Sequence, residues 1–321
     1  MIKKIVLQYL TLILLGISAI AVYGERSELE EIVVIGSEDQ IIRVPGSGTL
    51  LTEDDLDRFD YVDLHQILAS VPGIYIREED GFGLRPNIGI RGATPDRSQK
   101  ITIMEDGILI TPAPYSAPAA YYVPNVSRME NIEILKGPSA IRQGPHTVAG
   151  AINFVTKPIE EDSNHIDLSF GSDEYYKLQG NFSGFVDETG WQLDLNSYGS
   201  GGFKDLDGGG DTGFDRAEAN FKIQHDFDSE RPQRLVFKLG WADEGADETY
   251  LGLTDDDFKA NPERRYRASQ LANFETDHVT VHLNHGIEIS DNFSINTKLY
   301  WHDFDRAWKK LDGFIAGPAL Q

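Results

Sequence analysis

The chain has 321 residues, with 29 basic and 52 acidic side chains, which gives a formal net charge of −23 at pH 7. This excess of acid argues against nucleic acid as a partner, because a phosphate backbone selects basic surfaces. The chain has no cysteine, which excludes a disulfide framework, thiolate metal sites and cysteine nucleophiles.

The N-terminus has the pattern of an export signal. Lys3 and Lys4 precede an apolar run over residues 5–22, and Gly24 ends a Val-Tyr-Gly sequence suited to cleavage. The alternative is an uncleaved membrane anchor, although polar residues interrupt the run. We expect residues 1–24 to be a cleavable signal peptide.

A β-branched cluster, Ile32 to Gly36, follows a short acidic stretch and has no apolar neighbours to pack against. An isolated strand of this kind suits pairing with the sheet edge of a partner. It could equally be the first strand of the next domain, and physical reasoning alone leaves both interpretations open.

Residues 50–157 have a mixed α and β pattern. A short helix is expected after Thr52, and a second helix, capped by Asp60, is expected to end at Pro72 and Gly73. The apolar face of this second helix consists of Leu64, Ile67 and Leu68. Short strands bounded by glycine turns are expected at residues 74–76, 88–92, 101–104, 132–135 and 151–155.

Beyond Pro158 the strands are longer and amphipathic. Ala219, Phe221 and Ile223, for example, alternate with charged or amide side chains. A soluble β-sandwich would cover the apolar face with a second sheet, whereas an outer-membrane barrel would turn that face to lipid.

Loop lengths favour the barrel. Long connections, at residues 199–213 and 242–268, alternate with short ones such as residues 187–190. This alternation is typical of a barrel that carries its long loops at one end. We count about seven strands, too few to close a barrel.

No catalytic constellation is present: the sequence lacks a Walker-type lysine, a Gly-x-Ser-x-Gly elbow and a carboxylate pair, so no enzyme is expected. The glycine-rich segment 208–213 has neither the preceding strand nor the following helix of a phosphate loop. Its aspartates do not match a calcium loop. His278 and His282 lie about 13 Å apart if the segment is a strand, so they cannot chelate one zinc ion. We expect both to face a polar lumen and His285 to face the opposite way.

The segment from Asn131 to Ala140, followed by Gly144 and by residues 150–157, resembles the closing strands of the plug domain of TonB-dependent receptors. The Ile90-Arg91-Gly92 and Met104-Glu105-Asp106-Gly107 motifs occur upstream in the order and spacing of that family. The chain is thus similar to the N-terminal part of a TonB-dependent outer-membrane receptor. The resemblance implies an α+β plug domain followed by antiparallel transmembrane strands, about seven of a family barrel of roughly 22.

The resemblance also implies a domain order. Residues 1–24 would be the signal peptide, 25–40 a periplasmic segment with the TonB box, 41–158 the plug, and 159–321 the N-terminal portion of the barrel. The implied partners are outer-membrane lipid and TonB with its inner-membrane energising complex. The residues expected to contact TonB are Glu31, Ile32, Val33, Val34, Ile35 and Gly36.

Within the family, residues 112–115, 248–254 and 264–266 resemble receptors for ferric dicitrate. The expected ligand is therefore a transported Fe(III) chelate, with no resident cofactor or metal. Such a chelate is anionic and suits Arg and Lys donors. The candidate ligand-binding residues are Arg91, Arg97, Lys100, Lys136 and Arg142.

Two departures bear on the citrate assignment. Lys136 stands where the dicitrate receptor has an arginine, and Phe82 stands where a hydroxyl residue is expected. Arg91 could instead have a structural role, by satisfying carbonyls or pairing with an acidic neighbour. Another siderophore or a different nutrient therefore remains an alternative ligand.

Two alternatives to a transporter stay open. The chain could be a truncated, nonfunctional or binding-only fragment of a receptor, because an unclosed sheet leaves its edges unsatisfied in lipid. It could also be an extracellular binding module built on a soluble β-sandwich. The plug motif makes this second alternative the weaker one.

Overall fold

The computed structural model describes residues 46–58, 62–110, 122–144, 147–249, 251–290 and 292–311. The predicted signal peptide, the segment 31–36 expected to contact TonB, and the 112–115 motif lie outside these residues.

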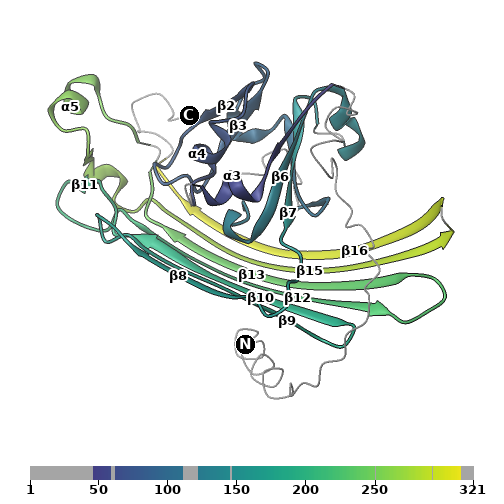
Figure 1. The fold of residues 1–321 in the computed structure, drawn as a ribbon. Helices are drawn as coiled ribbons and strands as arrows, with labels where there is room; N and C mark the ends of the chain where they lie inside the picture. The colour runs from purple at the N-terminus through teal and green to yellow at the C-terminus, as the bar shows by residue number, and fades with distance from the viewer. Residues whose placement is uncertain are drawn as a thin grey trace.

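The chain forms two units, an N-terminal α+β unit and a long curved sheet (Figure 1). The N-terminal unit contains a five-stranded sheet in the order β1-β6-β7-β4-β5 and a separate hairpin of β2 and β3. Strands β4 and β7 pair in parallel, and the other pairs are antiparallel. Its elements are β1 (Ser47–Leu51), α3 (Glu53–Asp57), α4 (Leu64–Leu68), β2 (Ile74–Arg77), β3 (Asn87–Ile90), η1 (Asp96–Ser98), β4 (Ile101–Glu105), β5 (Ile108–Leu109), η3 (Val126–Arg128), β6 (Met129–Lys136), η4 (Pro138–Gln143) and β7 (Gly150–Thr156).

The two helices of this unit begin at local capping signals. The backbone N–H of Thr52 donates to the Asp55 carboxylate at 3.1 Å, so α3 begins where the sequence predicts. The prediction that Asp60 caps the second helix is wrong. Helix α4 begins later, with Asp63 as its cap, and the Asp63 carboxylate accepts from the backbone N–H of His65 at 2.7 Å.

The core of the N-terminal unit lies between its sheet and α4. The predicted helix face of Leu64, Ile67 and Leu68 is buried there, as expected. Ile132 and Phe154, on adjacent strands, are fully buried in the same cluster. Burying this apolar area is the main stabilising contribution of such a unit.

The curved sheet has seven strands, each antiparallel to the next, which agrees with the predicted count. They are β8 (Asn164–Phe170), β9 (Tyr176–Val186), β10 (Thr189–Ser200), β12 (Phe214–Phe227), β13 (Gln233–Ala246), β15 (Asn273–Ser290) and β16 (Phe293–Lys309).

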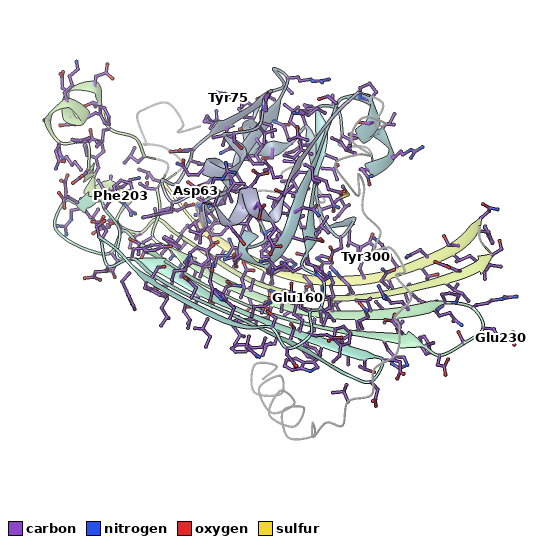
Figure 2. The ribbon with its side chains drawn as sticks, in the orientation of Figure 1. Asp63, Tyr75, Glu160, Phe203, Glu230 and Tyr300 are labelled. Carbon is purple, nitrogen blue, oxygen red and sulfur yellow. The ribbon has the colours of Figure 1, made fainter. Side chains whose placement is uncertain are left out.

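The long connections lie at one end of this sheet and short turns at the other. Figure 2 places Phe203 at the end that carries α5, and Glu230 at the opposite end. The prediction that the second long connection begins at residue 242 is wrong, because β13 continues to Ala246. The long connections also contain β11 (Asp205–Leu206), α5 (Asp255–Ala260), β14 (Arg264–Arg265) and η5 (Arg267–Ser269).

Burial on the curved sheet is inverted relative to a soluble protein. Charged side chains such as Arg216 and Glu218 are buried, with Glu218 only 2% exposed, because the N-terminal unit lies against their face of the sheet (Figure 1). On the opposite face, Leu168 and Trp301 are 61% and 54% exposed. A soluble sandwich would show the reverse. The described strands therefore have the pattern of a barrel wall. No helix in the described parts of the chain is long and apolar enough to cross a bilayer.

Candidate functional site: the contact between the N-terminal unit and the curved sheet

Arg85 joins the N-terminal unit to the curved sheet at the end that carries the long connections. The Asp80 carboxylate accepts from the backbone N–H of Phe82 at 2.6 Å and of Arg85 at 2.9 Å, which fixes the loop. The buried Arg85 guanidinium donates to Glu244 on β13 and to Glu248. Burial alone would lower the pKa of Arg85, but Glu244 and Glu248 outweigh it and hold that pKa above its ordinary value. Arg85 is therefore a permanent buried cation between two carboxylates.

A second buried pair lies within the N-terminal unit, where that unit meets the sheet. Arg128 donates to both oxygens of Glu105, at 2.9 and 2.6 Å. Burial raises the pKa of Glu105, but Arg128 and more distant cations outweigh burial and lower it from 4.5 to about 2. The Arg128 Nε also lies 3.9 Å from the Glu218 carboxylate on β12. Glu105 thus stays ionised at any ordinary pH.

Arg216 on β12 connects these two pairs. Its guanidinium donates to Glu218 at 2.5 Å and to Glu244 at 3.3 Å. It also donates to the backbone carbonyl of Val123 in the N-terminal unit. The Tyr122 hydroxyl donates to Glu218 at 3.3 Å. The pairs therefore form one continuous network of charged groups across the contact.

A turn at Asp106 makes a further connection nearer the other end of the sheet. The Asp106 carboxylate accepts from the backbone N–H of Thr156 at 3.0 Å and from Lys238 on β13. The Asp106 carbonyl accepts from Lys298 on β16 at 2.5 Å. Asp106 itself has a left-handed φ of 47°, a conformation that aspartate tolerates better than most residues.

These contacts fix position more than they add stability. Buried ion pairs lose much of their Coulomb gain to desolvation, but removing one partner leaves a buried charge without compensation. A displacement of the N-terminal unit that separates these pairs without exposing them to water therefore has a high free-energy cost.

Among the candidate ligand-binding residues, the structure brings Arg91 and Lys136 together. The Lys136 ammonium donates to the Thr49 hydroxyl at 2.7 Å and to the Pro72 carbonyl at 2.9 Å. Burial, and then the charge of Arg91, lower the pKa of Lys136. A Cβ placed on Gly137 would lie 3.0 Å from Arg91 Nη1, so the exposed Arg91 side chain passes close to this turn. Within the described ranges, no carboxylate pairs with either cation.

The other candidates have different surroundings. Arg97 lies 3.8 Å from Glu79, and its guanidinium carbon lies 5.2 Å from the ring centroid of Trp308. Lys100 and Arg142 are exposed. Of the five predicted residues, the contacts of the described part of the chain thus bring Arg91 and Lys136 together.

Phe82 packs among aromatic rings. Its ring centroid lies 5.5 Å from that of Phe203 and 4.7 Å from that of Phe214. Phe82 thus helps to hold the Asp80–Arg85 loop against the sheet.

The sequence analysis missed Arg85, Arg128 and Arg216 as functional residues. A usable signal was present for Arg216, since Arg216 and Glu218 share one face of a strand whose other face carries Ala217 and Ala219. Charges on the face turned away from lipid require a partner inside the barrel. For Arg85 and Arg128 we find no such local signal.

A protein-family profile described as TonB-dependent Receptor Plug Domain matches residues 40–151. Among curated proteins, the vitamin B12 transporter BtuB of Photobacterium profundum is 26% identical over 169 residues, which is 52% of this chain and 27% of that protein. The vitamin B12 transporter BtuB of Vibrio vulnificus is 24% identical over 213 residues, which is 65% of this chain and 32% of that protein.

Solved structures show the same fold. The ferric citrate transporter FecA in its unliganded form aligns with a TM-score of 0.71 and 21% identity, over 85% of this chain and 42% of that one. The ferric yersiniabactin uptake receptor FyuA from Yersinia pestis aligns with a TM-score of 0.66 and 18% identity, over 82% and 41%. The chain thus spans less than half the length of each of these proteins.

Proposed function

Because residues 40–151 match the profile of a TonB-dependent receptor plug domain and the following strands have the fold of part of such a receptor's barrel, we propose that the protein imports a ferric chelate across the outer membrane. The N-terminal unit is called the plug from here on. The observation that carries the proposal is the plug seated on the polar face of a sheet whose other face is apolar and exposed. A transporter needs such an arrangement, because the plug must move within a wall that stays fixed in lipid.

Energy would come from TonB and its inner-membrane complex. The segment Glu31 to Gly36 offers β-branched residues to the sheet edge of that partner, and backbone hydrogen bonds would transmit the pull. Force on this segment would then rearrange the plug locally, at contacts whose separation exposes charged groups to water.

The ligand would be a ferric dicitrate-like chelate or another ferric siderophore. Two adjacent cations, Arg91 and Lys136, support an anionic ligand, since neither pairs with a carboxylate within the described ranges. The matched BtuB proteins favour a second candidate, a cobalamin.

The first experiment measures uptake by cells that carry the whole gene, with radiolabelled ferric citrate and radiolabelled cobalamin compared in parallel. In the variant Val34→Pro, proline removes a backbone N–H that strand addition needs. We expect energised uptake of the ferric chelate to fall to the background of cells lacking the gene, while binding at 4 °C is retained.

The matched control is Ser27→Pro, which places the same proline in the preceding acidic stretch and should leave uptake unchanged. Normal uptake by Val34→Pro would contradict the role of this segment. Uptake of cobalamin without uptake of ferric citrate would mean that the ligand is a cobalamin and not a ferric chelate. Binding without uptake by the unaltered protein would contradict import.

A further inference from the structure

Three histidines of β15 and β16 form a hydrogen-bonded chain on the face that meets the plug. His302 pairs in register with Thr280, so it lies between His278 and His282 of the neighbouring strand. His278 Nε2 lies 3.2 Å from His302 Nδ1, and His282 Nε2 lies 3.2 Å from His302 Nε2. His302 thus uses both ring nitrogens to connect the other two. We call His278, His282 and His302 the histidine triad.

The triad contacts the plug directly. The ring centroids of His278 and Tyr122 lie 4.7 Å apart, and the backbone of Ile110 lies within hydrogen-bonding reach of the His302 ring. His278 and His282 are 2% and 7% exposed, so water has little access to them while the plug is seated. Any change in the charge of the triad therefore acts on the contact between plug and sheet.

The hydrogen bonds limit how many protons the triad can hold. Each neutral imidazole has one donor and one acceptor nitrogen, so three neutral rings can form the chain. One added proton can also be accommodated, since a protonated His302 would donate in both directions. A second proton would set one N–H against another across a 3.2 Å contact. The intact chain therefore accepts at most one proton, whereas three hydrated rings that no longer bond one another accept three.

Charged groups face the triad from both units. From the plug, Glu105 and Arg128 face the triad along with Tyr122; from the sheet, Arg216 and Lys238 face it. Glu105 is the carboxylate that interacts electrostatically with all three histidines, but both of its oxygens already accept hydrogen bonds from Arg128. With a pKa of about 2, Glu105 does not itself titrate under mildly acidic conditions.

We propose that the histidine triad makes the contact between plug and sheet acid-sensitive, so that acidification below about pH 6.5 loosens it. Protons that the buried chain cannot bind are taken up when the plug withdraws, because water then reaches the rings and replaces the hydrogen bonds between them. Mass action then favours the withdrawn state. For each additional proton that the withdrawn state can bind, lowering the pH to 5.0 raises the ratio of withdrawn to seated plug by up to about 30-fold, because an ordinary histidine has a pKa of about 6.5. This device would operate whatever the ligand and whatever the source of energy.

The test is amide hydrogen exchange of residues 101–110 in the whole protein purified from its membrane, at pH 7.5 and 5.0. Rates are corrected for the intrinsic effect of pH on exchange. We expect this segment to open at least about tenfold more often at pH 5.0, while β9, a wall strand, shows no such change. Equal corrected rates at the two pH values would overturn the proposal.

Variants assign the effect to the triad. Replacing all three histidines by glutamine, which hydrogen-bonds but does not titrate, should abolish the acid response, and His302→Gln alone should reduce it. The control His285→Gln lies on β15 but bonds Gln233 instead, and it should keep the full response. If the triple variant does not assemble, the comparison of His302→Gln with His285→Gln decides: equal responses would refute the proposal.

Discussion

Arg128, at the end of a short helical turn, balances the charges of two buried carboxylates. It holds both oxygens of Glu105 and approaches Glu218 of the sheet, and all three side chains are largely shielded from water. Losing the guanidinium would leave two buried carboxylates facing each other across the contact. Buried charges in this position are costly mainly when they lose a partner.

We therefore predict that Arg128→Met lowers the free energy of unfolding of the plug by about 3–5 kcal/mol. The matched control is Arg77→Met, which breaks a pair with Asp96 whose side chains are 54% and 51% exposed. That change should cost less than about 1 kcal/mol. Urea-dependent hydrogen exchange in β4 measures both values. Similar costs for the two variants would mean that the network contributes no more than a surface pair.

At the scale of elements, sequence patterns predicted most strands because alternation and glycine turns are local signals. The main boundary error, at the end of β13, has a long-range cause. Residues 242–246 contain acidic side chains and a glycine that are typical of a loop, yet they extend the strand because Glu244 meets Arg85, 159 residues earlier. No local pattern carries that information.

The same reason explains the limits of the candidate site. Arg91 and Lys136 were identified because they sit in motifs that resemble a family. Arg85 and Arg128 lie in irregular or short helical segments, and their partners are defined only once the plug packs on the sheet. Helix α5 was missed although a local signal was present, because Thr254 precedes three aspartates as a helix cap does. In the structure the Thr254 hydroxyl accepts from the backbone N–H of Asp257 at 3.3 Å.

The orientation of the strands leads to an element-scale prediction. Leu239 lies in the middle of β13 between Phe221 and Val281 of its neighbours, on the face turned away from the plug. If that face meets lipid, Leu239→Arg should destabilise the wall by about 2–4 kcal/mol. The control is Phe258→Arg in α5, where the side chain is 59% exposed in a long connection, and it should be near neutral. Stability is measured by urea titration in bilayers. Equal tolerance of both changes would argue against a lipid-facing sheet.

At the scale of the whole molecule, plug and wall are joined by polar contacts and by one apolar cluster. The plug has its own apolar core. Ion pairs and hydrogen bonds cross the contact at several places, and Phe82 and Leu84 of the plug pack against Phe214 and Phe274 of the wall. Polar contacts can be exchanged for water as the plug moves, whereas an apolar interface would resist hydration. The polar contacts are therefore suited to repeated separation, and the apolar cluster at the end with the long connections is the part of the contact that resists it.

A covalent tether tests whether separation is required. The Ser127 hydroxyl of the plug donates to the Asn196 side chain of β10 at 3.0 Å, and the chain has no cysteine of its own. In the double variant Ser127→Cys/Asn196→Cys, we expect oxidation to lower uptake at least about tenfold while ligand binding is retained, and reduction to restore uptake. The matched control, Asn181→Cys/Asp194→Cys, joins two side chains that contact at 2.6 Å within the wall. Its oxidation should leave uptake unchanged, because wall strands need not separate. Full uptake by the oxidised plug-to-wall variant, with the disulfide verified by mass spectrometry, would mean that the ligand passes without movement at this contact.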